Sequence, residues 1–218
     1  MVFVEKKVAL YSGRGGELFF DLELALKRLK IPYAKIKERE IWEDKLSSYS
    51  SLIFPGGVTV ILVSSLSERG LKKIRNFVHS GGGYLGICAG AYIAPSLVEV
   101  PGRPEGLGII NLQNKRERGS GLKLIRISCQ HPVTKGYQGE VKIYYQNGPL
   151  IVPGKDVEVL ARYKEEGDYA AIVASRYGQG KVVIFSPHPE GSREGKIDPE
   201  EAGTILLLKN ALEFICRS

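Results

Sequence analysis

The chain has 218 residues, of which 43% are hydrophobic and 25% charged, and its formal net charge is +7. This composition predicts a single folded domain over residues 1–218 and excludes a disordered, fibrous or disulfide-stapled protein. The longest apolar run, Val58 to Val63, is far shorter than the roughly 18 residues that cross a bilayer. The N-terminal charges follow the first apolar residues, which is the reverse of a secretory signal. We therefore expect a soluble, cytoplasmic protein that contacts no membrane.

The positive charges are dispersed, apart from Lys115, Arg116 and Arg118, which we predict to form an exposed loop beside two glycines. We expect no nucleic-acid partner, because such binding needs a clustered basic stripe. The three cysteines form no CxxC pair, and the three histidines lack the spacing of metal ligands. We predict no metal and no cofactor. The single methionine and the Lys/Glu-rich faces are typical of a thermophilic source.

Short apolar runs alternate with amphipathic segments in the first half, a pattern that predicts βαβ units around a parallel sheet. The predicted strands are 8–11, 32–36, 51–54 and 84–87, and the predicted helices are 17–30, 67–78 with Ser67 as its N-cap, and 89–94. The turn at 12–16 has no GK[ST] sequence and is more typical of a tight turn than of a phosphate cradle.

Glycine-rich, strand-like runs fill the second half, at 122–127, 141–145, 157–163, 169–177 and 181–185, before a C-terminal helix at 199–215. The expected fold is therefore a three-layer α/β/α sandwich, flavodoxin-like, with a mostly parallel sheet and added antiparallel strands in its second half.

Gly86-Ile-Cys88-Ala-Gly90 lies where the strand at 84–87 ends and the next helix begins. Small residues two before and two after a nucleophile allow the sharp turn of a nucleophile elbow. This turn would place the Cys88 sulfur at the carboxyl edge of the sheet, beside the N-terminus of a helix whose dipole favours the thiolate. The alternative is a buried, structural cysteine in a glycine-rich contact.

Ser186-Pro-His188-Pro-Glu190 follows another apolar strand, so its side chains should reach the same edge of the sheet. His188 would act as the base for Cys88, and Glu190 would orient the imidazole. The alternatives are a loop histidine and a solvated acid. For the oxyanion we expect the amide of Ala89 and that of Gly56 or Gly57.

These motifs resemble those of the class I glutamine amidotransferase superfamily, whose Cys-His-Glu triad they carry. The similarity extends over nearly the whole chain, and it is greatest to the amidotransferase-like domain at the N-terminus of biotin-protein ligases and to its free-standing homologues. The segments that carry it are 11–13, 54–57, 77–78, 82–92, 144–149 and 187–190.

The resemblance implies that Cys88 is the nucleophile, His188 the base and Glu190 the orienting acid, with the Gly57 and Ala89 amides as oxyanion donors. Glutamine-hydrolysing members carry a glutamine where this chain has Tyr92. The sequence has no GRGRxxR motif, so we expect no biotinylation activity.

Two functions remain open. In the first, the protein is a thiol-dependent amide hydrolase that acts on a small carboxamide and either passes ammonia to a partner synthetase or ligase or simply releases it. In the second, it is a catalytically silent module that binds a small metabolite and regulates a partner. We expect the ligand to contact Gly56, Tyr92, Tyr144 and Tyr145.

Overall fold

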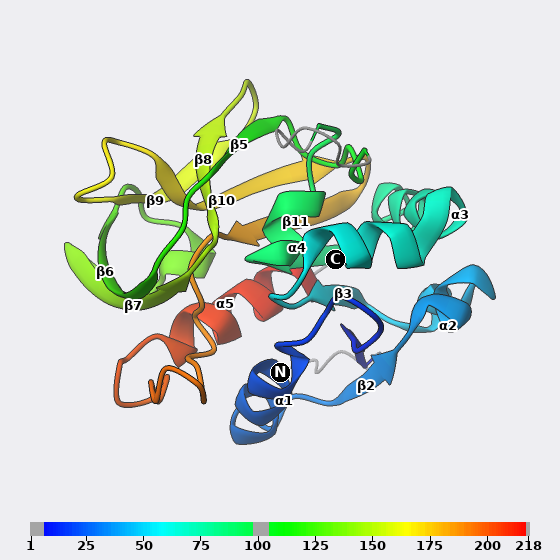
Figure 1. The fold of residues 1–218 in the computed structure, drawn as a ribbon, viewed down its shortest axis with the longest axis horizontal. Coiled ribbons are helices and arrows are strands. Elements are labelled where there is room, and N and C mark those ends of the chain that lie inside the picture. Colours follow the sequence, from blue (N-terminus) through cyan, green and yellow to red (C-terminus); the bar gives the residue numbers. More distant parts are fainter. Residues whose placement is uncertain (1–6, 98–104, 217–218) are drawn as a thin grey trace.

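The structure, a computed structural model, describes residues 7–97 and 105–216. Its first part alternates strands and helices as predicted (Figure 1). The elements are β1 (Val8–Tyr11), α1 (Phe19–Arg28), β2 (Tyr33–Ile36), α2 (Glu38–Trp42), the 3-10 helix η1 (Lys45–Ser48), β3 (Ser51–Phe54), α3 (Thr59–His79), β4 (Gly83–Ile87) and α4 (Ala89–Ile93).

The second part is built mainly of antiparallel strands and ends in a helix. Its elements are β5 (Leu112–Arg116), β6 (Ser120–Ile127), the 3-10 helix η2 (Pro132–Thr134), β7 (Glu140–Gln146), β8 (Pro149–Pro153), β9 (Glu158–Tyr163), β10 (Ala170–Tyr177), β11 (Gly180–Phe185) and α5 (Ile205–Cys216). The predicted C-terminal helix therefore begins six residues later than expected, because residues 199–203 form turns.

Within the described residues, the strands form one eleven-stranded sheet with the order β2-β1-β3-β4-β11-β10-β9-β6-β7, and β8 pairs with β10 and β5. Pairing is parallel from β2 to β11 and antiparallel beyond it. The predicted combination of a parallel core with added antiparallel strands is confirmed. Strands β5 and β8 were not predicted, and Lys115 and Arg116 belong to β5 rather than to a loop.

Alternate residues of each central strand enter two different cores, as the period of a strand requires. Val8 and Leu10 of β1 face the core that α1 and α5 cover, whereas Ala9 and Tyr11 face the core that α3 covers. The predicted three layers are therefore present, with helices on both faces of the sheet (Figure 1).

Helix α3 differs from the prediction at its start. It begins at Thr59 and runs through Ser67, whose φ of 56° and ψ of 171° interrupt the helix. The Val58–Val63 run therefore supplies an extra helical segment that buries Leu62, Val63 and Leu66. Across the described residues, we find no helix with the length and apolar character needed to span a membrane.

Candidate functional site

Cys88 lies between β4 and α4 with a backbone φ of 51° and ψ of −100°. A positive φ is rare for a residue with a side chain, and such strain is typical of a nucleophile elbow. Both flanking glycines are required by close backbone contacts. A Cβ at Gly86 would lie 2.5 Å from the Gly90 carbonyl oxygen, and a Cβ at Gly90 would lie 2.5 Å from that of Phe54. The predicted elbow geometry is therefore present.

The thiol of Cys88 is largely enclosed. The residue is 6% exposed, and its Sγ donates a hydrogen bond to the Gln146 carbonyl oxygen over 3.4 Å. Its own amide donates to the Phe185 carbonyl at the end of β11. The elbow is thus attached both to the strand that precedes His188 and to the end of β7.

His188 and Glu190 follow β11, which pairs with β4 in parallel so that Phe185 lies opposite Ile87. This register brings the residues after both strands to one edge of the sheet. The two side chains are buried, at 1% and 3% exposure, and His188 Nδ1 lies 2.9 Å from Glu190 Oε1.

The imidazole and the thiol meet at Gly56. An added Cβ on Gly56 would lie 2.9 Å from His188 Cε1 and 3.4 Å from Cys88 Cβ, so both side chains border the same point. His188 Nε2 is buried and makes no hydrogen bond of ordinary geometry with the described residues. The structure therefore brings the three predicted triad residues together, although 100 positions separate Cys88 from His188 in sequence.

The surroundings of His188 favour its protonated form. Burial alone would lower the pKa of the ring and is the largest single effect. The negative charge of Glu190, together with interactions with the Cys88 and Glu190 side chains, outweighs burial and holds the pKa of His188 well above 6.5. The ring is thus suited to carrying a proton beside the thiol.

The two backbone amides expected as oxyanion donors, those of Gly57 and Ala89, follow β3 and β4 in the chain. Gly57 has a φ of 153°, and its Cβ would lie 2.0 Å from the Gly15 carbonyl, so a side chain has no room there. Ala89 is the first residue of α4 and follows the nucleophile directly. Among residues 7–97 and 105–216, neither amide donates a hydrogen bond to another group. Both are therefore available to a ligand atom.

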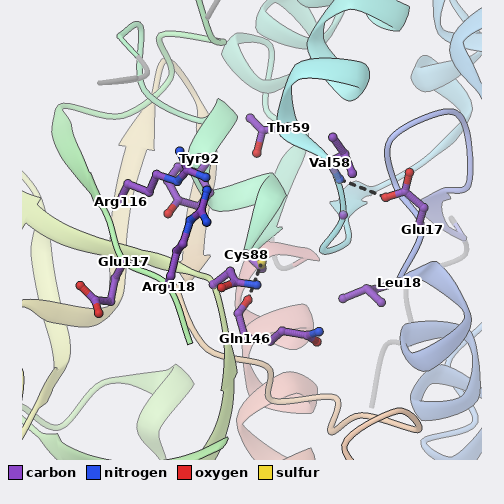
Figure 2. A pocket seen from close by; sticks show the side chains of 12 residues that line it. Glu17, Leu18, Val58, Thr59, Cys88, Tyr92, Arg116, Glu117, Arg118 and Gln146 are labelled. Atoms are coloured by element: carbon purple, nitrogen blue, oxygen red, sulfur yellow. Dashed lines mark hydrogen bonds between the residues drawn. The ribbon is translucent and has the colours of Figure 1, made fainter. Parts of the chain in front are cut away.

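The thiol borders a pocket of about 470 Å³ (Figure 2). Its walls come from the β1–α1 turn, the start of α3, the elbow, the loop after β5 and the end of β7. The lining residues are Glu17, Leu18, Gly57, Val58, Thr59, Cys88, Tyr92, Arg116, Glu117, Arg118, Gln146 and Asn147.

Of the three tyrosines expected to contact a ligand, Tyr92 lines the pocket and the other two do not. Tyr144 accepts a backbone hydrogen bond from the His188 amide over 2.7 Å, and its ring lies 5.9 Å from the imidazole. Tyr145 is buried in the same core as Cys88, its hydroxyl donates to the Gly148 carbonyl, and burial raises its pKa. Tyr145 lies on the opposite face of β7 from Gln146, because successive side chains of a strand alternate, whereas Tyr144 is taken up by its contact with His188.

Several pocket residues were not among the sequence candidates. Arg116 and Arg118 extend toward Tyr92, whereas Glu117 points away from them (Figure 2). In the described residues, neither arginine forms an ion pair or hydrogen bond with another side chain. Gln146 belongs to the segment 144–149 that the resemblance had already marked, and its Oε1 is buried without a hydrogen-bond partner. The resemblance in segment 144–149 was therefore the sequence feature that could have identified this part of the pocket wall.

No three His, Cys, Asp or Glu side chains are grouped as metal ligands in the part of the chain that the structure describes. The site offers a thiol, an imidazole whose raised pKa favours its protonated form, a carboxylate and two backbone amides without hydrogen-bond partners among the described residues.

Comparisons with known proteins give the family. The family model "Biotin-protein ligase, N terminal" matches residues 29–206. The biotin–protein ligase of Schizosaccharomyces pombe is 27% identical over 239 residues, covering 92% of this chain and 36% of the ligase. This chain therefore spans little more than a third of that relative.

Two further relatives match over most of their length. The pyridoxal 5′-phosphate synthase subunit PdxT of Deinococcus radiodurans is 34% identical over 181 residues, covering 78% of this chain and 85% of PdxT. A solved glutamine amidotransferase structure is 28% identical with a TM-score of 0.66, covering 94% of this chain and 98% of that one. The chain therefore belongs to the biotin-protein ligase N-terminal family, whose fold is that of the class I glutamine amidotransferases.

Proposed function

We propose that this protein is a thiol-dependent amide hydrolase of the glutaminase or amidase type. The observation that carries the proposal is the meeting of Cys88 and His188 at Gly56, with Glu190 hydrogen-bonded to the far side of the ring. A nucleophile, a base and a group that orients the base are the parts that acyl transfer through a thiolate needs.

The reaction begins when the Cys88 thiolate attacks the carbonyl carbon of the amide. The amides of Gly57 and Ala89 stabilise the oxyanion that forms. His188 gives its proton to the leaving nitrogen, and ammonia departs as the thioester forms. His188 then takes a proton from water, the hydroxide attacks the thioester, and a carboxylic acid leaves as the Cys88 thiolate is restored beside the protonated His188.

The charges of the pocket favour a substrate with both an acidic and an amino group. Arg116 and Arg118 lie on one side of the thiol, and the Glu17 carboxylate lies on the other, where it accepts from the Val58 amide over 3.0 Å (Figure 2). An amino-acid carboxamide would place its carboxylate at the guanidinium groups and its ammonium group toward Glu17. The ammonia released would pass to a synthetase or ligase partner.

Ammonia release tests the proposal. Glutamine, asparagine and other carboxamides should be screened, with Cys88→Ser as the inactive control. We expect at least one amino-acid amide to release ammonia and Cys88→Ser to abolish that release. Release that is equal in Cys88→Ser, or absent for every carboxamide, would reject the hydrolase.

One observation favours the second candidate, a catalytically silent binding module. The Cys88 thiol is 6% exposed and donates its hydrogen to Gln146, an arrangement that also suits a structural cysteine. Iodoacetamide separates the two functions. A hydrolase should alkylate at Cys88 much faster than at Cys129, whose pKa is raised by burial and by Glu158, whereas a silent module should not.

A further inference from the structure

The position of Glu190 is not explained by its own hydrogen bonds. Its Oε1 meets His188, but its Oε2 is buried without a hydrogen-bond partner among the described residues. A carboxylate held on one oxygen can rotate or retreat unless its backbone is fixed. The loop that carries Glu190 must therefore supply the remaining constraint.

That loop folds back on itself directly after Glu190. Gly191, at a φ of 76°, donates to the His188 carbonyl, and Ser192 and Ile197 exchange two backbone hydrogen bonds of 3.0 and 2.8 Å. Arg193 therefore lies in a tight turn only three residues beyond Glu190. A displacement of Arg193 would be transmitted to the carboxylate over a short, stiff path.

Arg193 is attached to helix α1 through Asp21. Its Nε donates to Asp21 Oδ1 over 2.6 Å, and its backbone amide points at the same oxygen from 3.4 Å. Its guanidinium group also lies 5.2 Å from the centre of the Phe20 ring. The Asp21 side chain is 6% exposed, whereas that of Arg193 is 60% exposed. The charged partner on the helix is thus fixed by burial, and the arginine is held against it.

Helix α1 also helps to shape the pocket. Leu18, just before the helix, lines the pocket and donates its amide to the Gly56 carbonyl over 3.1 Å. Its Cδ1 would lie 2.8 Å from a Cβ added to Gly56, the point where Cys88 and His188 meet. Asp21 is one turn away on the same helix.

Three side chains surround the His188 ring. Cys88 faces it from the elbow, Glu190 from the same loop and Tyr144 from β7. A hollow of about 210 Å³ extends behind Glu190, and its charged lining consists of Asp21, Arg28, Glu190, Arg193, Lys196 and Asp198. The Asp21–Arg193 pair joins the two sides of this hollow at the turn nearest Glu190.

We propose that Asp21 is a positioning residue for the triad. Through Arg193 it holds the loop after β11 against α1, and so keeps the Glu190 carboxylate against His188 in register with the pocket. This inference rests on the proposed function for its biological meaning, but its test needs no substrate.

The chain offers a matched control. Arg28 and Asp198 join the same helix to the same loop over 2.7 Å, eight residues beyond Glu190, with both side chains 31% exposed. Asp198→Asn removes the same charge from the same pair of segments, but farther from the triad. Both substitutions remove one negative charge and keep a side-chain acceptor, which in Asp198 also serves the Glu200 amide.

The test compares Asp21→Asn, Arg193→Gln and Asp198→Asn by two readouts. The first is the titration midpoint of the His188 ring by NMR, and the second is the alkylation rate of the Cys88 peptide at neutral pH. We expect Asp21→Asn and Arg193→Gln to lower the midpoint and to slow alkylation on the order of tenfold, because a misplaced orienting group weakens the pair. Asp198→Asn should change neither, and Arg193→Lys should restore much of the wild-type behaviour.

Equal midpoints and rates in wild type, Asp21→Asn and Arg193→Gln would overturn the inference, as would an equal change in Asp198→Asn. Arg193 is largely exposed, so Arg193→Gln remains informative if Asp21→Asn fails to fold. Failure of the proposed function would appear instead as missing ammonia release, with the two readouts still measurable.

Discussion

The parallel and antiparallel halves of the sheet contribute different parts of the candidate site. The parallel half, with β4 and β11 at its border, supplies Cys88, His188 and the Gly57 amide from the residues that directly follow strands. The antiparallel half supplies Arg116 and Gln146, which line the pocket from the ends of β5 and β7. The reacting groups are thus fixed by short steric contacts, whereas Arg116, Arg118 and Gln146 lie at strand ends and in a loop of the antiparallel half. Reactivity and specificity should therefore respond separately to substitution.

Glu190→Gln should impair catalysis more than Gly56→Ala, Arg118→Ala or Tyr145→Phe. It removes the charge that holds the proton on His188, and we expect amide hydrolysis to fall on the order of 10³-fold. Steady-state kinetics would measure this loss, and a near-normal kcat would contradict the role of Glu190. A substitution in the antiparallel wall of the pocket, formed by Arg116, Arg118 and Gln146, should not cause a comparable loss of activity.

The same substitution should change how stability depends on pH. The pKa of His188 is raised above 6.5 in the folded chain, so its protonated form adds stability that is fully present below about pH 6.5. That stability is lost as the pH rises through the folded pKa. We predict that the difference in free energy of unfolding between wild type and Glu190→Gln is largest below about pH 6.5 and shrinks in alkaline buffer. Urea unfolding across pH would measure it, and a difference that grows with pH would contradict the assignment.

Gly56→Ala tests the meeting point itself. The added methyl group would lie 2.9 Å from the imidazole and 2.8 Å from Leu18 Cδ1, so the ring or the leucine must move. We expect kcat to fall on the order of 10²-fold, since small displacements of reacting groups are costly. The melting temperature should be measured in parallel. A kcat near that of wild type would show that the ring and thiol need not meet there.

Arg118→Ala tests the antiparallel wall. The guanidinium group touches the pocket but not the triad, so we expect KM for an acidic carboxamide to rise about tenfold with kcat little changed. Arg126→Ala is the matched control, because Arg126 lies on the neighbouring β6 and pairs with Glu140 away from the pocket. A fall in kcat with unchanged KM would break the separation between the two halves.

Tyr145→Phe should have the smallest effect on catalysis. Its hydroxyl donates to the buried Gly148 carbonyl and does not line the pocket. We expect stability to fall by about 1 kcal/mol and KM to remain within about twofold of wild type. Thermal unfolding and kinetics would measure the two quantities. A large rise in KM would restore the ligand contact expected from sequence.

The sequence predicted the parallel half well, because its strands are continuous apolar runs and its turns carry glycines that close contacts require. Gly86 and Gly90 have no room for a Cβ, so the elbow requires glycine at both positions. The spacing of these two glycines around Cys88 was therefore enough to predict the elbow. Strands β5 and β8 were not predicted, because β5 is rich in polar residues and β8 is bounded by prolines. Their pairing depends on contacts between distant segments.

The start of α3 was missed for a related reason. No capping side chain marks it, since Val58 stands at its N-cap, and the Ser67 backbone interrupts it. The pocket wall was missed because Arg116 and Arg118 are ordinary charged residues in sequence, and only the fold places them beside Cys88. The partnership of Asp21 with Arg193 spans 172 positions and has no local signal.

Strand β11 pairs with β4 on one side and with β10 on the other, so the short turn between Tyr177 and Gly180 sets the register of both halves. Because side chains alternate along a strand, a slip of one residue would exchange the two faces of everything that follows. The turn lies at the opposite end of β11 from His188, and a one-residue shift of β11 against β4 would point the residues of β11 to the other face of the sheet. The turn itself is confined by close contacts, because a Cβ at Gly178 would lie 2.5 Å from the His79 carbonyl oxygen and one at Gly180 would lie 2.1 Å from that of Val78.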